Sequence, residues 1–248
     1  MTTWLDGPLL GFDTETTGVN PFRDRIVSAA LIGRGPRGSA QRVWLLNPGV
    51  PIPEEAAAIH QITTAHATEH GMAPREALAQ ISAELLAAFR RGTPVVAYNA
   101  AFDLTILERE LERHGLPTLG EELGGPLAPV LDPLLLDRGL AADRNGRRTL
   151  LDLCGYYGVQ ENGRLHTADV DVTATLDILA AQVRDYPELI RESPATLHHW
   201  QVRQHRRWAS AEVERRRRSR HPAPAPGWPL HTSDPTAPST PGPGALSA

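Results

Sequence analysis

The stretch that decides the fold is Leu9-Leu10-Gly11-Phe12-Asp13-Thr14-Glu15-Thr16-Thr17-Gly18, an apolar run that passes directly into polar residues and a glycine. This pattern predicts a buried strand that enters a loop near Asp13. Side chains two positions apart on a strand point to the same face, so we expect Asp13 and Glu15 to project together. Two converging carboxylates repel each other unless a cation neutralises them, and oxygen ligands suit Mg²⁺ or Mn²⁺. The alternative is that one carboxylate points to solvent and the other caps a turn.

Three further polar residues lie next to the predicted starts of helices. Asp103 follows a predicted strand and begins a helix, where an acidic side chain also interacts favourably with the helix dipole by itself. His166 and Asp171 are five residues apart, and on one helix this spacing separates the side chains by about 140°. We therefore expect His166 on the loop before a helix and Asp171 in its first turns. Two other aspartates, Asp132 and Asp152, are interpreted as structural.

The rest of the chain alternates between strand and helix patterns. Apolar runs bounded by turn residues predict strands, and a Gly-Pro-Arg-Gly turn at 35–38 joins two of them as a hairpin. The expected strands cover residues 9–13, 25–33, 41–46 and 94–99, and the expected helices cover residues 53–59, 74–91, 101–114, 150–158 and 167–185. Residues 129–136 fit either pattern. This order indicates an α/β fold, in which helices flank a sheet.

Charge is distributed unevenly along the 248 residues. All 25 basic residues are arginines, and the formal net charge is −4. Residues 1–197 carry 17 arginines against 26 acidic residues, whereas residues 198–248 carry 8 against 3. An acidic body with a basic tail suits a metal-binding enzyme that acts on a polyanion. An acidic solvated surface with a solubilising tail explains the same charges equally well.

Composition also divides the chain into three parts. Residues 1–195 carry the strand and helix patterns and are expected to form the globular domain. Residues 196–220 predict an Arg-rich helical extension, in which Arg215–Arg218 forms either a solvated helix end or a phosphate-contacting arm. Residues 221–248 contain eight prolines and one acidic residue, and this composition cannot bury enough apolar surface to order itself. We therefore expect a disordered Pro-rich C-terminal tail.

Several classes of protein are excluded by what the sequence lacks. Cys154 is the only cysteine, which excludes an intramolecular disulfide framework and a cysteine-rich zinc site. No apolar stretch reaches about 18 residues, so we expect no transmembrane helix and no membrane partner. The N-terminus has neither a basic region nor a long apolar run, so we expect no signal peptide. These features favour a cytoplasmic location.

The polar stretches resemble the three exonuclease motifs of the DEDDh family of 3′→5′ exonucleases, and look most like the epsilon (proofreading) subunits of bacterial DNA polymerase III. The matching strings are Phe12–Gly18, Tyr98-Asn99-Ala100-Ala101-Phe102-Asp103, and His166 followed by Asp171. The resemblance covers about residues 8–185. Two positions depart from the family pattern. Tyr98 stands where the family often has histidine, and Gln61 in Ile59-His60-Gln61-Ile62-Thr63 stands where it has glycine.

The resemblance implies a ribonuclease H-like fold, with a mixed central β-sheet flanked by α-helices. It implies that two divalent cations, Mg²⁺ or Mn²⁺, are bound by Asp13, Glu15, Asp103 and Asp171, and that His166 completes the catalytic set as the general base. Histidine ordinarily titrates near pH 6.5 and can accept a proton from water near neutrality. The expected substrate contacts are Thr14, Thr16, Thr17, Asn99, Phe102 and His166. For Asn99 and Phe102 the alternatives are a helix cap and a core residue.

The function that this resemblance implies is 3′→5′ hydrolysis of DNA 3′ ends to nucleoside 5′-monophosphates, in repair or proofreading. Single-stranded or frayed DNA is the expected substrate, and a DNA polymerase catalytic subunit is a candidate partner, although a stand-alone exonuclease is favoured. An exoribonuclease with the same site is the alternative, because only contacts to the 2′-OH would distinguish the two substrates. A catalytically silent nucleic-acid-binding adaptor would have lost one of the five catalytic residues, and none is lost.

Overall fold

The computed structural model describes residues 3–160, 166–219 and 224–234. Its centre is a mixed sheet with the strand order β3-β2-β1-β4-β5. The strands are, in chain order, β1 (Leu9–Thr16), β2 (Ile26–Gly35), β3 (Gly38–Leu45), β4 (Val95–Val96) and β5 (Val130–Leu131). β1 pairs with β2 and β2 pairs with β3 in antiparallel ladders, while β4 is parallel to β1 and to β5. The expected mixed sheet is confirmed, with β1 as its middle strand.

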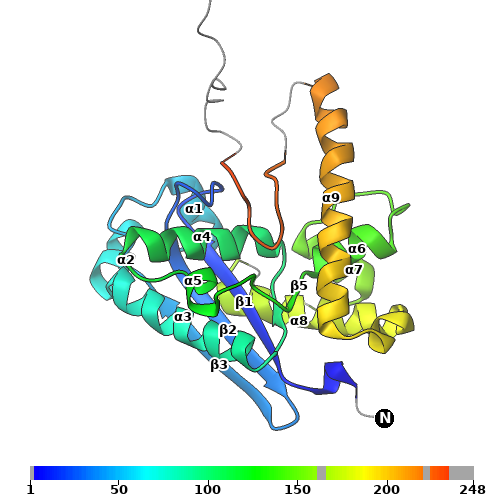
Figure 1. Cartoon of the computed structure of the whole chain (residues 1–248). Helices are drawn as coiled ribbons and strands as arrows, with labels where there is room; N and C mark the ends of the chain where they lie inside the picture. The colour runs from blue at the N-terminus through cyan, green and yellow to red at the C-terminus, as the bar shows by residue number, and fades with distance from the viewer. Residues whose placement is uncertain (1–2, 161–165, 220–223, 235–248) are drawn as a thin grey trace, which may run out of the picture.

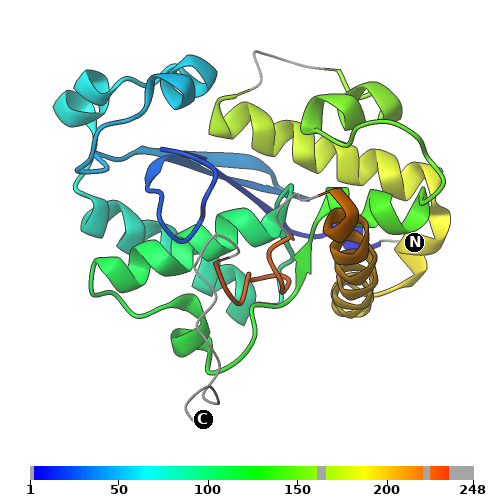
Figure 2. The ribbon, with the colours of Figure 1, turned by 90° about the horizontal axis from the view of Figure 1, so that it is seen from above.

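Helices cover both faces of this sheet (Figures 1 and 2). They are α1 (Glu54–His60), α2 (Thr64–His70), α3 (Pro74–Arg90), α4 (Ala100–Arg113), α5 (Leu119–Leu123), α6 (Pro133–Leu140), α7 (Leu150–Tyr157), α8 (Ala168–Asp185) and α9 (Pro194–Ser219), with short 3-10 turns at Trp4–Asp6 and Pro187–Arg191. Sequence reasoning did not predict the short helices α2 and α5. Within the described ranges, every helix is too short or too polar to cross a bilayer.

The alternation of β1 side chains divides the core into two layers. Phe12, fully buried, packs with α3 and α4 on one face, and Leu10 packs against the same cluster. Leu9 packs on the other face with α8 side chains such as Val172 and Leu176. Because one strand supplies apolar side chains to both layers, the position of β1 is fixed from two sides.

The sheet edge at β5 is covered by α9 rather than left open. His198 Nδ1 accepts a hydrogen bond from the Val130 amide at 3.2 Å, and Gln201 Oε1 accepts one from the Asp132 amide at 2.8 Å. Gln201 Nε2 also donates to the Val130 carbonyl at 3.1 Å. These side chains satisfy backbone groups that a further strand would otherwise pair with. The helix expected from residue 196 thus begins at Pro194, and its first half belongs to the packed body.

The described part of the Pro-rich segment, residues 224–234, lies against this body, which differs from the expectation of a disordered tail from 221 onward (Figure 1). Trp228 is 8% exposed, packs its ring 5.0 Å from that of His198, and places Nε1 3.4 Å from Asp132 Oδ2. The His231 amide donates to Thr105 Oγ1 at 2.9 Å. One large aromatic side chain thus anchors the segment, whereas its average composition predicts no packing against the body.

Candidate active site

The candidate site begins with a close approach of α8 to β1. Gly11, Asp13 and Glu15 point to the α8 face of the sheet, as the spacing of two predicts. A Cβ on Gly11 would lie 2.3 Å from Val172 Cγ1, so only glycine lets α8 come this near. Asp171, which precedes Val172, is thereby carried to the end of β1. One oxygen each of Asp13, Glu15 and Asp171 lies within 4.8 Å of the others. The predicted convergence is present.

Asp103 reaches the same end of β1 from the opposite layer. It lies in the first turn of α4 and is only 4% exposed. Its Oδ1 accepts hydrogen bonds from the Thr14 amide at 3.0 Å and from Thr14 Oγ1 at 2.7 Å. Asp103 stands outside the tight group of three, but its charge acts on the pKa of both Asp13 and Glu15. The four expected metal ligands are therefore neighbours in the fold.

Burial and mutual repulsion make this cluster reluctant to ionise. Burial raises the pKa of Asp13 well above its usual range, and the carboxylates of Asp103, Glu15 and Asp171 raise it further. Burial raises the pKa of Glu15 to about 8, with smaller contributions from Asp171 and Asp103. The pKa of Asp103 rises to about 7, because burial outweighs the two hydrogen bonds from Thr14. Burial also raises the pKa of Asp171, opposed by the hydrogen bond from the His166 amide.

Among the described residues, the charge of His166 acts on this cluster and lowers the pKa of Asp171. No arginine in the described ranges forms an ion pair with any of these four carboxylates. Carboxylate oxygens are the ligands that hard divalent cations take. The residues present therefore fit a metal site, and the donor set of Asp13, Glu15 and Asp171 could hold an ion.

His166 occupies the predicted position relative to the helix that carries Asp171. It stands on the loop before α8, with Asp171 in the first helical turn. Its amide donates to Asp171 Oδ1 at 3.1 Å, and its side chain is exposed. His166 has φ +80°, a left-handed conformation that costs a non-glycine residue about 1–3 kcal/mol; strained residues of this kind cluster at functional sites. Residues 161–165, which precede it, lie outside the described residues.

The first turn of α4 is held by an aspartate that sequence reasoning assigned only a general structural role. Asp132 Oδ1 accepts from the Asn99 amide and Oδ2 from the Ala100 amide, each at 3.1 Å. Oδ1 also accepts from the Leu134 amide at 3.0 Å, so one carboxylate caps both α4 and α6. The Asp132-Pro133 pair, a cap residue followed by proline at the first helical position, was the available sign of this role.

The expected substrate contacts are placed as follows. Thr16 Oγ1 donates to the Gly18 carbonyl at 2.7 Å, and Thr17 Oγ1 donates to Asp24 Oδ1 at 3.1 Å. With Thr14 bonded to Asp103, all three hydroxyls have partners inside the protein. Their contact with a substrate stays a prediction, as does that of Asn99 and Phe102.

Asn99 is the N-cap residue of α4, but its side chain makes no capping hydrogen bond, and its φ is 57°. Phe102 is half-buried. Of the two departures from the family pattern, Gln61 ends α1 at φ 63°, the left-handed conformation that glycine favours. The backbone shape that a glycine would allow is thus kept by glutamine, at some strain.

Comparisons with known proteins relate this chain to exonucleases. The family model described as Exonuclease, of RNase T type, matches residues 10–179. A DNA polymerase III subunit epsilon-like protein of Rhodobacter capsulatus is 36% identical over 174 residues, which are 67% of this chain and 22% of that protein. A PolC-type DNA polymerase III of Streptococcus thermophilus is 29% identical over 176 residues, which are 70% of this chain and 11% of that protein. The chain thus spans about a fifth or less of these relatives.

Solved structures of exonuclease I share the fold. E. coli exonuclease I in complex with a dT13 oligonucleotide superposes with a TM-score of 0.62 at 20% identity, over 74% of this chain and 42% of that chain. Exonuclease I of Methylocaldum szegediense gives a TM-score of 0.61 at 24% identity, over the same shares of the two chains. The expected ribonuclease H-like fold, with a mixed sheet flanked by helices, is confirmed.

Proposed function

The chain belongs to this exonuclease family, and from that premise we propose that it is a metal-dependent 3′→5′ exonuclease of the DEDDh type. It would hydrolyse phosphodiester bonds at DNA 3′ ends and release nucleoside 5′-monophosphates. The observation that carries the proposal is the convergence of Asp13, Glu15 and Asp171, within 4.8 Å of one another. No arginine in the described ranges forms an ion pair with them. Acidic crowding of this kind is stable in its ionised form only around bound cations.

We assign two divalent cations, Mg²⁺ or Mn²⁺, to this cluster, held by Asp13, Glu15, Asp171 and Asp103. When bound, such ions polarise the scissile phosphate and stabilise the charge that develops on the attacking and leaving oxygens. Thr14 holds Asp103 in one orientation through two hydrogen bonds to the same oxygen. That leaves Asp103 Oδ2 as the atom available for a further ligand.

His166 is assigned as the general base. Its amide donates a hydrogen bond to Asp171 Oδ1, so the backbone that carries the imidazole is positioned by a proposed metal ligand. The exposed imidazole can take up the proton of the attacking water and pass it to solvent. We propose that the terminal nucleotide is contacted by residues at the end of β1 and the start of α4, namely Thr14, Thr16, Thr17, Asn99 and Phe102.

The substrate is proposed from the relatives. Those named above are DNA polymerase III proteins, and exonuclease I is solved with a DNA oligonucleotide. Single-stranded or frayed DNA 3′ ends are therefore the proposed substrate, in repair or proofreading, and a polymerase catalytic subunit is a candidate partner. Trimming of RNA ends by the same site is the alternative outcome of the test below.

The test follows a 5′-labelled DNA 20-mer and the RNA of the same sequence with Mg²⁺ or Mn²⁺. Asp171→Ala is matched by Asp185→Ala, the same change at the other end of α8, where Asp185 is exposed and pairs with Arg184. The wild type and Asp185→Ala should give a ladder that shortens from the 3′ end, and Asp171→Ala should give none. No metal-dependent cleavage of either strand, or equal activity of both variants, would refute the proposed function.

A further inference from the structure

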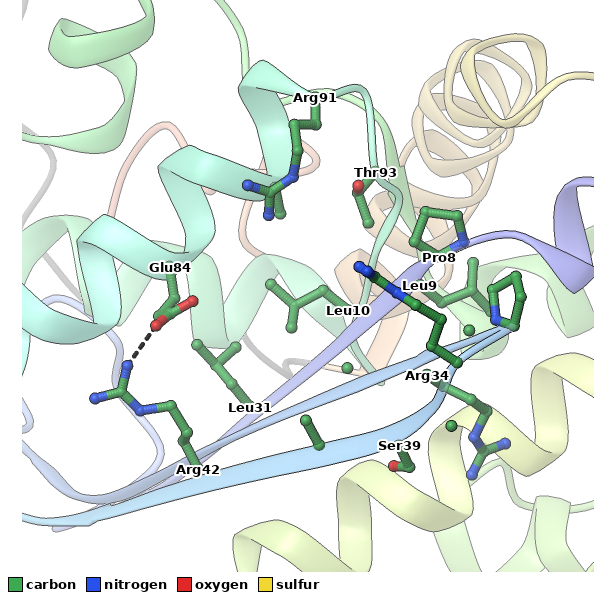
Figure 3. Close-up of a pocket in the computed structure, with 17 residues that line it drawn as sticks. Pro8, Leu9, Leu10, Leu31, Arg34, Ser39, Arg42, Glu84, Arg91 and Thr93 are labelled. Atoms are coloured by element: carbon green, nitrogen blue, oxygen red, sulfur yellow. Dashed lines mark hydrogen bonds and ion pairs between the residues drawn. The ribbon is translucent and has the colours of Figure 1, made fainter.

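A hollow of about 1080 Å³ opens at the start of β1, the opposite end of this strand from Asp13 and Glu15. Its floor is apolar and includes Leu10 of β1 and Leu31 of β2, which belong to the α3 and α4 layer of the core. The tip of the β2–β3 hairpin and the C-terminal end of α3 form its rim (Figure 3). We call this feature the hairpin hollow. The proposed reaction uses none of its residues.

The hairpin hollow exists because small residues face it where none of the described helices covers the sheet. Leu10 pairs with Gly33 across β1 and β2, and Gly33 pairs with Ala40 across β2 and β3. A Cβ on Gly33 would meet only the Ala40 carbonyl oxygen, at 3.8 Å, so a side chain there would project into open space. α3 covers the same layer but ends at Arg90. Within the described part of the chain, the strand pairs beyond that point have no covering helix.

The rim of the hairpin hollow carries most of its charge as arginine. Four arginines and one glutamate line it, in a chain whose net charge is −4. Arg34 pairs with Asp177 at 2.7 Å, and Arg42 pairs with Glu84 (Figure 3). Arg37 and Arg91, by contrast, form no ion pair with any residue in the described ranges. Two guanidinium groups beside an apolar floor therefore lack a carboxylate partner.

We propose that the hairpin hollow binds an acidic peptide segment of a partner protein that carries at least one large apolar side chain. The apolar side chain would cover the leucine floor, and peptide carboxylates would pair with Arg37 and Arg91. Arginine forms bidentate pairs with carboxylates, and such pairs at the rim of an apolar pocket add orientation to the affinity gained by burial. Arg91 directly follows α3, and a cationic side chain is favoured beside the partial negative charge of a helix C-terminus.

A nucleic-acid strand fits the hairpin hollow less well. Single-stranded nucleic acid gains much of its affinity from bases stacked on aromatic side chains, about 1–3 kcal/mol per base. None of the described residues that line the hollow is aromatic. Its leucine floor suits an aliphatic or aromatic side chain of a peptide instead. Charge complementarity and the apolar floor together favour the peptide.

Fluorescence anisotropy with labelled ten-residue peptides tests this proposal on the full chain. One peptide alternates aspartate with leucine, a second alternates aspartate with serine, and a labelled thymidine decamer is the nucleic-acid probe. EDTA in the buffer removes divalent ions, so the binding result is independent of exonuclease activity. The variants are the double change Arg37→Glu/Arg91→Glu, and Gly33→Leu, which fills the hollow. Arg75→Glu is the control, an exposed arginine in the first turn of α3.

The aspartate–leucine peptide should saturate the wild type and Arg75→Glu with equal affinity. Each of the two hollow variants should weaken this binding at least tenfold, and the aspartate–serine peptide should bind at least tenfold more weakly than its leucine counterpart. If Gly33→Leu does not fold, as judged by its thermal melting, the arginine double variant decides alone. The proposal would be overturned if the peptide showed no saturable binding, or if the double variant bound it as the wild type does. It would also be overturned if the changes at Arg37 and Arg91 weakened binding of the thymidine decamer but not of the peptide.

Discussion

Replacing Glu15 with glutamine removes one of the crowded carboxylates and keeps almost the same shape. In the metal-free fold, burial first, and then the charges of Asp171 and Asp103, raise the pKa of Glu15 from 4.5 to about 8. The folded state therefore keeps a proton over a pH range in which the unfolded chain releases it. The stability that comes with this proton is fully present below pH 4.5 and is lost as pH rises towards 8.

The two pKa values set the size of the effect. Linkage gives a loss of about 1 kcal/mol at pH 5 and about 3 kcal/mol at pH 7, relative to acid solution. Glutamine does not titrate, so the Glu15→Gln variant lacks this loss. Between pH 5 and pH 7 the metal-free wild type should therefore lose about 2 kcal/mol more of its unfolding free energy than the variant does.

Urea unfolding in EDTA at pH 5, 6 and 7 measures this difference. Glu188→Gln serves as the control, because Glu188 is exposed and lies in the 3-10 turn after α8. Its pH dependence should match that of the wild type. Added Mg²⁺ or Mn²⁺ should stabilise the wild type by mass action at pH 7 and should stabilise Glu15→Gln much less. A Glu15→Gln variant that destabilises with pH as steeply as the wild type would show that this carboxylate is neither crowded nor desolvated.

Three further outcomes are expected. Gly11→Ala should displace α8 through Val172, which should weaken metal binding and lower the unfolding free energy by about 1–3 kcal/mol. Gly155→Ala has open space at its Cβ and should change neither property. Trp228→Ala should lower the unfolding free energy by about 3–5 kcal/mol in urea titrations; a loss under 1 kcal/mol would mean that residues 224–234 are not docked in solution. At saturating Mg²⁺ the cleavage rate should rise with pH through roughly 6–7.5, and a flat profile would argue against His166 as the base.

The sequence predicted the parts of the fold whose causes are local. The strand before Asp13 was found because an apolar run meets two acids, and α3 was found almost to the residue because Pro74 begins it and an amphipathic pattern continues to Arg90. Residues 129–136 stayed ambiguous because they contain both elements. A two-residue strand is followed directly by a helix that begins at Pro133. So short a strand has no periodicity of its own to detect.

Long-range contacts account for what the sequence did not reveal. The hydrogen bond between Asp103 and Thr14 joins residues 89 positions apart, and nothing in either segment marks it. The docking of residues 224–234 depends on Trp228. A single tryptophan has little effect on the average composition of a proline-rich segment, so composition did not predict this contact. Gln61 shows the opposite case. A glycine at this position would have predicted a left-handed turn. The glutamine adopts that turn although its residue type does not predict it.

β1 positions both helices of the candidate site, α8 and α4. α8 is positioned on one face by the absence of a side chain at Gly11, and Asp103 of α4 is positioned from the other layer by two hydrogen bonds from Thr14. Asp171 and Asp103 are therefore placed independently of each other, each by an adjacent part of the same strand. A change at Gly11 should move Asp171 and leave Asp103 in place, whereas Thr14→Val should free Asp103 and leave Asp171 in place. Because two metal ions would share ligands from both helices, either change should impair activity far more than it impairs folding.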